Sequence, residues 1–245
     1  ALFCPLAPVM RCHNRFLDTP SSQAIKCTRD TSDKMTKLIL VRHGRTVWND
    51  GLRYQGHLDI ELSELGHVQA RQTAACLKNI TLDAAYTSDL RRCHDTAAAI
   101  LSNRDVPLVA RTDLRETHYG EWQGLTYAEV RQRYPYILQM RVQDPIGYAA
   151  PRGETVGQMT ARVCAAIEEI AAKHDGGSVL VVTHGGPLRA VVCDLLAVEP
   201  RRGWRIMVEN CSVTVIEVTA GQPDRSRLVL FNDVCHLNNG HAHPL

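Results

Sequence analysis

The stretch LILVRHGRTVWN, residues 38–49, begins with four apolar residues and passes directly into an arginine, a histidine and a glycine. A short apolar run of this kind is typical of a buried β-strand, which we expect over 37–41. A second stretch, SVLVVTHGG over 178–186, repeats the pattern of an apolar run that ends in histidine and glycine. The sequence thus predicts two buried strands that each carry a histidine to their end.

Helical and strand-like patterns alternate around these two runs. A helical stretch that Ser63 can cap carries Leu65, Val68, Ala75 and Leu77. Further predicted elements are a strand over 83–88, a helix over 89–101, a helix with Val156, Met159, Val163, Ile167 and Ile170 on one face, and closing strands over 210–218 and 226–231. This alternation predicts an α/β fold, a three-layer α/β/α sandwich with a mainly parallel central sheet.

The composition limits the classes of function. The 245 residues are 44% hydrophobic and 22% charged, which is ordinary for a soluble globular protein. A net charge of +2 is too small, and the basic residues are too scattered, to indicate nucleic acid or a membrane surface as a partner. The chain has no run of about 18 apolar residues, so we predict no membrane-spanning helix.

The nine cysteines are an odd number with no CxxC pair. This pattern favours reduced thiols and a cytoplasmic location over a disulfide framework. Cys164 and Cys193 lie inside apolar stretches, so we expect them to be small buried apolar residues.

Residues 1–34 differ from the rest of the chain, because they contain Pro5, Pro8 and Pro20 and show no sustained period of either secondary structure. We expect them to be a disordered N-terminal extension, or an artefact of how the chain was delimited, with Met35 as the natural start. Residues 35–245 are expected to form a single domain.

The chemistry follows from where the two histidines stand. In an open parallel sheet, ligands bind beyond the carboxyl ends of the strands, and His43 and His184 both follow such ends. Gly44 and the pair Gly185–Gly186 let the backbone turn sharply, and a helix that follows offers its N-terminal N–H groups to an anion. The guanidinium of Arg42 can bind two oxygens of a phosphate or carboxylate. These residues therefore predict an anion site.

An ordered set of motifs then points to a family. The motifs are VRHGRTVWN, QGHLDIELSELGHVQA, TSDLRRCHDTA, LRETHYGEWQG, APRGET and VVTHGG. In this order they resemble the histidine phosphatase superfamily, in its phosphoglycerate-mutase-like branch, from Lys37 to about Leu237. The resemblance implies the phosphoglycerate-mutase-like fold. It also implies phosphoryl transfer through a phosphohistidine, with no metal and no cofactor.

The resemblance implies a role for each matched residue. His43 would be the nucleophile, held on its other ring nitrogen by a backbone carbonyl and kept neutral by the arginines. Glu116 would donate a proton to the departing alkoxide and then take one from water. Arg42, Arg92 and His184 would hold the phosphoryl oxygens, and the substrate-binding candidates are Thr46, Asn49, Gln55, Gly56, Tyr119 and Gly185. Tyr119 and Trp122 could equally be the rim of the pocket or plain core.

The chain departs from the usual family pattern at two positions. The residue after the RHG triplet is Arg45 where the family usually has Glu, and Cys93 stands where Ala is usual. Arg45 could favour more anionic substrates. Arg91 competes with Arg92 for the pocket, but adjacent helical residues point about 100° apart, and the motif favours Arg92.

The other histidines are expected to play lesser parts. His57 and His118 could line the pocket mouth, whereas His67 and His94 lie on predicted helices and could face solvent. His241 and His243, with Cys235–His236, lack an established metal-ligand spacing and are expected to belong to a flexible tail.

These observations predict a phosphomonoesterase acting on a small-molecule phosphomonoester, such as alpha-ribazole phosphate or a phosphoglycerate derivative. One alternative is a 2,3-bisphosphoglycerate-dependent phosphoglycerate mutase, which the RETHYG motif resembles, although 125–153 looks like the shorter phosphatase form. Another is a non-catalytic member that binds phosphorylated ligands. A monomer and a homodimer both remain open.

Overall fold

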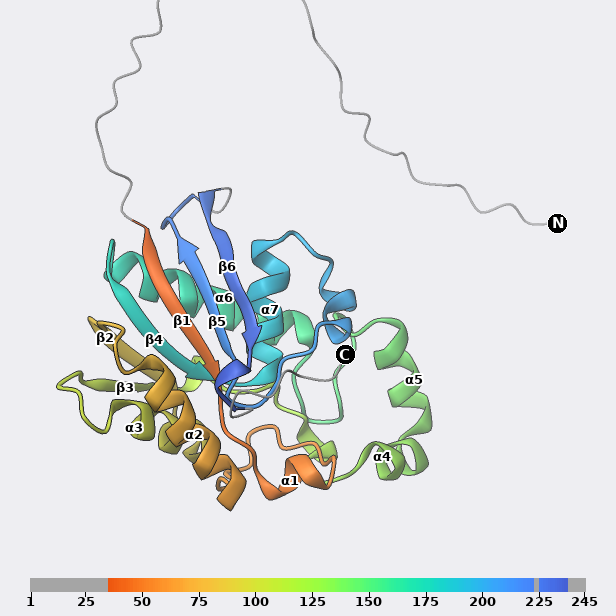
Figure 1. Ribbon diagram of the computed structural model, residues 1–245. Helices are drawn as coiled ribbons and strands as arrows, with labels where there is room; N and C mark the ends of the chain where they lie inside the picture. Colours follow the sequence, from red (N-terminus) through yellow and green to blue (C-terminus); the bar gives the residue numbers. More distant parts are fainter. Residues whose placement is uncertain (1–34, 223–224, 238–245) are drawn as a thin grey trace, which may run out of the picture. The chain divides into compact units, whose positions relative to one another are not determined.

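A single six-stranded sheet forms the centre of the computed structural model, which describes residues 35–222 and 225–237 (Figure 1). The prediction for residues 1–34 and those for His241 and His243 lie outside the described residues. The sheet has the order β3-β2-β4-β1-β5-β6. Its strands are β1 (Thr36–Arg42), β2 (Ala84–Ser88), β3 (Leu108–Arg111), β4 (Ser178–Thr183), β5 (Val213–Val218) and β6 (Arg227–Asp233).

The sheet is mainly parallel, as predicted. The strands β3, β2, β4 and β1 run parallel to one another, whereas β5 is antiparallel to β1 and β6 is antiparallel to β5. The strands β1 and β4 lie side by side, and Arg42 is paired with Thr183 at their carboxyl ends. The next residue of each strand is a histidine, so the register alone brings His43 and His184 to the same edge of the sheet.

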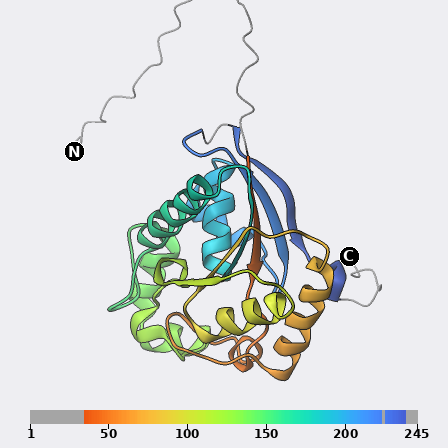
Figure 2. The same ribbon diagram turned by 90° about the vertical axis from the view of Figure 1, so that its left-hand side faces the viewer.

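Helices cover both faces of the sheet, which gives the three predicted layers (Figure 2). Side chains alternate along β1, so Leu38 and Leu40 pack on one face and Ile39 and Val41 on the other. The first face is covered by α6 (Val156–Lys173) and α7 (Gly185–Leu195), and the second by α2 (Glu64–Leu77) and α3 (Arg91–Leu101).

The apolar spacing identifies the buried face of one predicted helix but not of another. Helix α6 buries Met159, Val163, Ile167 and Ile170, with Val156 half-buried, as the spacing predicts. Helix α2 begins after Ser63, whose hydroxyl accepts from Gly66 N at 3.1 Å. Its buried face consists of Gly66, Ala70, Thr73 and Leu77, and Leu65 and Val68 are exposed.

The chain between β3 and α6 builds a small helical subregion. It contains α4 (Tyr127–Arg133) and α5 (Pro135–Gln143), preceded by the short 3-10 turns Thr112–Leu114 and Gly120–Trp122. Trp122, Val130, Leu138 and Ala150 form a separate buried cluster there. The short helix α1 (Val47–Asp50) follows β1, and further 3-10 turns span Pro200–Arg205 and Cys235–Leu237.

The predicted burial of the two cysteines is confirmed for one and wrong for the other. Cys193 is buried, as expected, whereas Cys164 is only half-buried, so the expectation is wrong for that residue. It lies on α6 beside the buried Val163, at a position turned partly toward solvent. Among the residues that the structure describes, no helix is both long and apolar enough to cross a membrane.

Candidate active site

His43 stands directly after β1 and is 3% exposed. Its ring nitrogen Nδ1 lies 2.8 Å from the carbonyl oxygen of Gly44. A carbonyl can only accept, so Nδ1 carries the proton and Nε2 keeps its lone pair. The expected contact with a backbone carbonyl is therefore present, and it leaves Nε2 available for nucleophilic attack.

The surroundings of His43 keep the ring neutral. Burial, followed by the positive charges of Arg92 and Arg42, holds the pKa of this imidazole well below its usual 6.5. The main chain is fixed as well, since His43 N donates to Thr183 O and the Asn210 amide donates to His43 O. A fixed, neutral imidazole is the state that a nucleophilic histidine needs.

His184 caps α7 and faces His43, with 5.1 Å between the ring centroids. Its Nδ1 accepts from Arg92 Nε at 3.3 Å, so its Nε2 carries the proton and lies 2.9 Å from Ser88 Oγ. Burial, with the charge of Arg92 next, also holds the pKa of His184 well below 6.5. Both ring nitrogens are thus engaged by protein groups in this structure.

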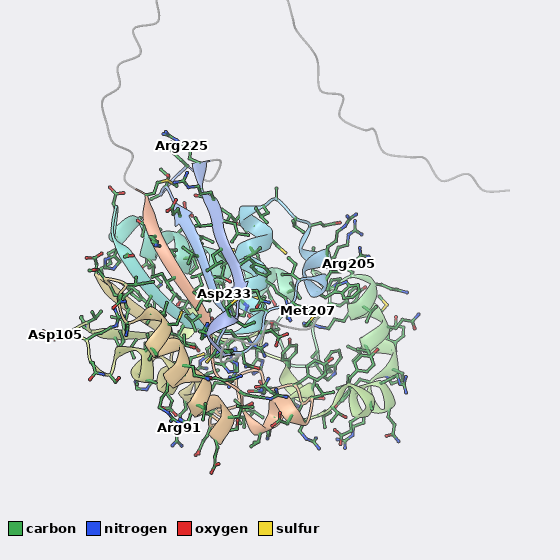
Figure 3. The ribbon with its side chains drawn as sticks, viewed as in Figure 1. Arg91, Asp105, Arg205, Met207, Arg225 and Asp233 are labelled. Carbon is green, nitrogen blue, oxygen red and sulfur yellow. The ribbon has the colours of Figure 1, made fainter. Side chains whose placement is uncertain are left out.

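Of the two neighbouring arginines, Arg92 is the one that lies beside His184, which agrees with the choice that the motif favoured. Arg92 is fully buried, whereas Arg91 lies at the surface of the molecule (Figure 3). The Arg91 side chain pairs with Glu61 and Asp95. The two terminal nitrogens of Arg92 donate to the carbonyl oxygens of Leu58 and Gly56 at 2.8 and 2.7 Å. These carbonyls fix the plane of the guanidinium beside His184.

The backbone conformation at residue 56 requires a glycine. Its φ is +54°, and a Cβ there would lie 2.3 Å from Gln123 Oε1. The turn at Gly56 presents its carbonyl oxygen to Arg92, so among the substrate-binding candidates this residue acts here through its main chain.

Arg42 ends β1 and reaches the N-terminus of α7. Its Nη1 donates to Val208 O at 2.5 Å, and its Nε is buried with no hydrogen-bond partner among the described residues. A Cβ on Gly185 would lie 3.5 Å from this Nε, so the first turn of α7 stands against the guanidinium. None of the described residues accepts a hydrogen bond from Gly185 N–H. These free donors make this corner suited to an anion.

Glu116 is held at the same helix N-terminus. Its Oε1 accepts from its neighbour Thr117 N at 2.8 Å, and its Oε2 accepts from Gly186 N at 3.1 Å. A Cβ on Gly186 would lie 2.1 Å from Glu116 Oε1, so the carboxyl group occupies the space that a side chain would need. The main-chain oxygen of Glu116 accepts from Arg162 and lies 2.8 Å from His57 Nε2.

Thr46, Asn49 and Gln55 form one hydrogen-bonded group. Thr46 caps α1 with a capping box, in which Asn49 Oδ1 accepts from Thr46 N and Thr46 Oγ1. Gln55 Nε2 donates to the same hydroxyl at 2.8 Å, and Gln55 Oε1 is buried without a partner among the described residues. The arrangement fixes the side-chain amide of Asn49 through its oxygen and leaves its Nδ2 as a donor.

A pocket of about 640 Å³ adjoins Glu116 through Thr117 and Gly186. Tyr119 and Trp122 both line it, and Trp122 is at the same time 1% exposed and part of the helical subregion's core. The two readings of these aromatic residues are therefore not alternatives, because the core of the subregion is also the wall of the pocket.

Four residues of this site are not among the candidates that the sequence predicts: Ser88, Arg141, Arg162 and Arg189. For Ser88 a signal exists, because it ends β2 and so lies at the carboxyl edge of the sheet. The three arginines lie on α5, α6 and α7, where nothing in the sequence distinguishes them from surface charges.

The remaining expectations have mixed outcomes. Arg45 pairs with Asp50 at 2.5 Å near the molecular surface, and its effect on more anionic substrates stays a prediction. The rings of His57 and His118 pack edge-to-face with centroids 4.6 Å apart, and His57 Nε2 lies 2.8 Å from the main-chain oxygen of Glu116. Neither histidine is in the lining of the pocket.

The structure also describes three histidines for which no role in the site is expected, His67, His94 and His236. His67 and His94 are exposed on α2 and α3, as expected. Cys235 and His236 lie in the 3-10 turn Cys235–Leu237, so the expectation of a flexible tail is wrong for them. His236 Nε2 lies 3.0 Å from Thr73 Oγ1 and 3.1 Å from Cys211 O, which ties this turn to the domain, and the described residues include no metal-holding cluster.

The chain is similar to known phosphatases. The profile of the histidine phosphatase superfamily (branch 1) matches residues 38–233. Phosphoserine phosphatase 1 of Hydrogenobacter thermophilus is 35% identical over 83% of this chain and 95% of its own. The native structure of a mycobacterial glucosyl-3-phosphoglycerate phosphatase has a TM-score of 0.72 at 33% identity, covering 81% and 99% of the two chains. A 2,3-bisphosphoglycerate-dependent phosphoglycerate mutase 2 of Gloeobacter violaceus is 31% identical over 75% and 86%.

Proposed function

Because the chain belongs to branch 1 of the histidine phosphatase superfamily, we propose that it hydrolyses a small phosphorylated metabolite through a phosphohistidine at His43, without a metal ion. The observation that carries this proposal is the group of side chains at the ends of β1 and β4. His43 presents a free Nε2 near the guanidiniums of the half-buried Arg42 and the buried Arg92, with the Glu116 carboxyl group held at the first turn of α7.

The first half-reaction forms a bond between His43 Nε2 and phosphorus. The nitrogen lone pair attacks in line with the ester oxygen, and the phosphorus–oxygen ester bond breaks. Glu116, as the carboxylic acid, gives its proton to the departing alkoxide oxygen, which leaves as an alcohol. Hydrogen bonds from two main-chain N–H groups hold the Glu116 side chain in place for this transfer.

The second half-reaction releases inorganic phosphate. Water attacks the phosphorus of phosphohistidine while the Glu116 carboxylate takes one of its protons, and the phosphorus–nitrogen bond breaks. His43 returns to the neutral imidazole, with Nδ1 still on Gly44 O. The protons and the electron pairs balance without any cofactor.

The negative charge of the phosphoryl group is met by fixed cations and N–H donors. Arg42 Nε has no partner among the described residues, and the Gly185 N–H beside it is a further donor. In this proposal Asn49 Nδ2, whose amide oxygen is held by Thr46, donates as well. In this proposal Arg92 adds its positive charge, and His184 donates from Nε2 to the phosphoryl group in place of Ser88 Oγ. Thr46, Gln55 and Gly56 orient the residues that touch the substrate. Preorganised donors of this kind supply the electrostatic stabilisation that a metal would otherwise give.

A mutase would return the phosphoryl group from His43 to a second hydroxyl. Suppressing water needs a closed pocket. Tyr127 and Trp204, which line the pocket, are 52% and 75% exposed. The pocket is therefore open to water, which favours hydrolysis over transfer to a second hydroxyl. The test measures phosphate release from 3-phosphoglycerate and from an aryl phosphate, beside 2,3-bisphosphoglycerate-dependent isomerisation. Efficient isomerisation with negligible phosphate release would overturn the proposed hydrolysis.

A non-catalytic phosphate-binding member is the other alternative, and it would release no phosphate in the same assay. The chain has the residue that the family pattern expects at each matched catalytic position, which favours an enzyme. These residues are His43, Glu116, Arg42 and Arg92. The cytoplasmic location, the absence of nucleic-acid and membrane partners and the choice between monomer and homodimer stay predictions from the sequence.

A further inference from the structure

The pocket beside Glu116 is far larger than a phosphoryl group. Its volume is about 640 Å³, and one water molecule takes about 30 Å³ in the liquid, so the pocket has room for a body of drug-like size. It opens from Thr117 and Gly186, the residues that flank the Glu116 carboxyl group. His43, Arg42, Arg92 and His184 do not line this pocket, so Thr117, Gly186 and Arg189 form the link between the phosphoryl site and the pocket.

Aromatic rings form much of the pocket wall. Tyr54, Tyr119 and Trp122 are mutually packed, with ring centroids 4.8 Å apart for the two tyrosines and 5.7 Å for Tyr54 and Trp122. Tyr127 and Trp204 add two more rings, which are largely exposed. Such a wall favours a planar or apolar body, because it offers dispersion contacts and ring stacking.

The charged residues in the wall are all cations. Arg141, Arg189 and Arg201 line the pocket, and no described aspartate or glutamate does. Arg201 pairs with Glu199, but Arg141 and Arg189 donate to the carbonyl oxygens of Tyr148 and Ile206. Within the described part of the chain, these two arginines have no carboxylate partner.

Arg189 also stands at the junction of the two sites. Its Nη1 would lie 3.8 Å from a Cβ on Gly185, and Arg42 Nε would lie 3.5 Å from the same point. Arg141 lies over the rings of Tyr119 and Trp122, 5.6 and 5.8 Å from their centroids. The two uncompensated guanidiniums thus lie along the pocket wall, one near the phosphoryl site and one over the aromatic rings.

We propose that the substrate is the phosphate ester of a large alcohol whose body is aromatic or otherwise apolar and carries a carboxylate. The body fills the aromatic pocket, and the carboxylate binds Arg189 or Arg141. The proposal rests on the proposed function, since it assigns the alcohol half of the same phosphomonoester. Hydrolysis yields the free hydroxy acid and inorganic phosphate, so no further reactant is needed.

The size of the leaving group is tested with three esters of primary alcohols, which keeps the basicity of the leaving oxygen similar. The probes are phosphoserine, 2-naphthylmethyl phosphate and the same naphthylmethyl phosphate with a 6-carboxylate. We expect kcat/KM to rise by about tenfold from phosphoserine to the neutral naphthyl ester, and by about tenfold again with the carboxylate.

The outcomes separate the two proposals. Equal or better hydrolysis of phosphoserine would overturn the assignment of a large apolar body while leaving the phosphatase in place. Equal rates for the neutral and the carboxylated naphthyl esters would overturn the carboxylate assignment. If none of the three esters, nor 3-phosphoglycerate, releases phosphate, then the proposed function itself fails.

Variants locate the carboxylate-binding group. Arg189→Met and Arg141→Met are compared with Arg133→Met, an exposed arginine of α4 outside the pocket. We expect the kcat/KM ratio of the carboxylated to the neutral naphthyl ester to fall about tenfold in at least one pocket variant and to stay at the wild-type value in Arg133→Met. An unchanged ratio in both pocket variants would contradict the assignment, and a ratio is insensitive to partial unfolding.

Discussion

At the scale of single residues, Gly186 leaves no room for a side chain. A Cβ there would lie 2.1 Å from Glu116 Oε1, although the position belongs to α7, where alanine is intrinsically the better helix former. We therefore expect Gly186→Ala to fold and to displace the carboxyl group. The expected loss in kcat is about 100-fold, the lower range for general acid catalysis.

The matched control is Gly51→Ala, where the nearest atom to the new Cβ would lie at 3.7 Å. Steady-state kinetics and a thermal melt of both variants make the measurement. Wild-type kcat in a folded Gly186→Ala protein would show that the position of Glu116 is not important.

The protonation of His43 is also decided by its immediate neighbours. Burial and the charges of Arg92 and Arg42 lower its pKa below 6.5, so the ring stays neutral as pH falls through 6.5 and is protonated only at lower pH. We expect NMR titration of the ring to place its midpoint below 6.5 and Arg42→Met to raise that midpoint. A midpoint at or above 6.5 in the wild type would refute this electrostatic account.

At the scale of elements, α6 holds the main chain that carries Glu116. Arg162 donates to the carbonyl oxygens of Asp113 and Glu116, both at 2.8 Å, and pairs with Glu154 at 2.6 Å. We expect Arg162→Met to lower kcat about tenfold with a smaller change in KM, because the acid is misplaced while the phosphate-binding arginines remain. Arg162→Lys should recover part of the loss.

Arg111→Met is the matched control, because Arg111 also forms ion pairs near this segment but contacts Asp113 and Glu169 and not Glu116. Steady-state kinetics of the three variants provide the comparison. An equal loss of kcat in Arg111→Met would indicate general destabilisation and not positioning of Glu116.

The elements differ in how far the sequence reveals them. The strands β1 and β4 are uninterrupted runs of buried aliphatic residues, so their pattern is plain, and so is the apolar stripe of α6. Helices α4 and α5 are short, and each buries one residue, Val130 or Leu138, which leaves no periodicity to detect. Their starts did carry signals, a capping box of Thr126 with Glu129 and a proline at the first position of α5.

At the scale of the whole molecule, the sheet register explains why the phosphoryl site could be predicted and the pocket could not. His43, Arg92 and His184 meet because three neighbouring strands end at one edge, a rule that holds for any parallel sheet. The pocket lining comes from segments near residues 54, 119, 141, 156, 189 and 203, whose meeting depends on loop geometry. Arg141 and Arg189 therefore could not be told from surface arginines.

The buried histidines make the stability of the whole domain depend on pH. His43 and His184 have a pKa lowered below 6.5 in the folded state, so the unfolded chain binds more protons as pH falls below 6.5. We expect the free energy of unfolding in urea to decrease between pH 6.5 and 5. The decrease should approach about 1.4 kcal/mol per pH unit for each histidine.

The exposed His67 of α2 provides the control, since His67→Gln should keep the wild-type dependence while His184→Gln should weaken it. Stability that stays flat over this range in the wild type would contradict the account.

In this account the arginines compensate the negative charge of the phosphoryl group, so we predict that catalysis needs no divalent metal ion. The described residues contain no cluster of histidine, cysteine, aspartate or glutamate able to hold a metal ion. We expect dialysis against EDTA to leave the rate of phosphate release unchanged. A loss of activity that a divalent cation restores would show that metal chemistry contributes.

The central claim is that His43 Nε2 takes the phosphoryl group, and trapping that intermediate tests it most directly. The enzyme is mixed with a phosphomonoester, quenched at alkaline pH within one turnover and mapped by mass spectrometry. The account predicts a base-stable, acid-labile phosphate on His43 that is absent from His43→Ala. Phosphate on another residue, or full turnover by His43→Ala with no phosphorylated protein, would contradict it.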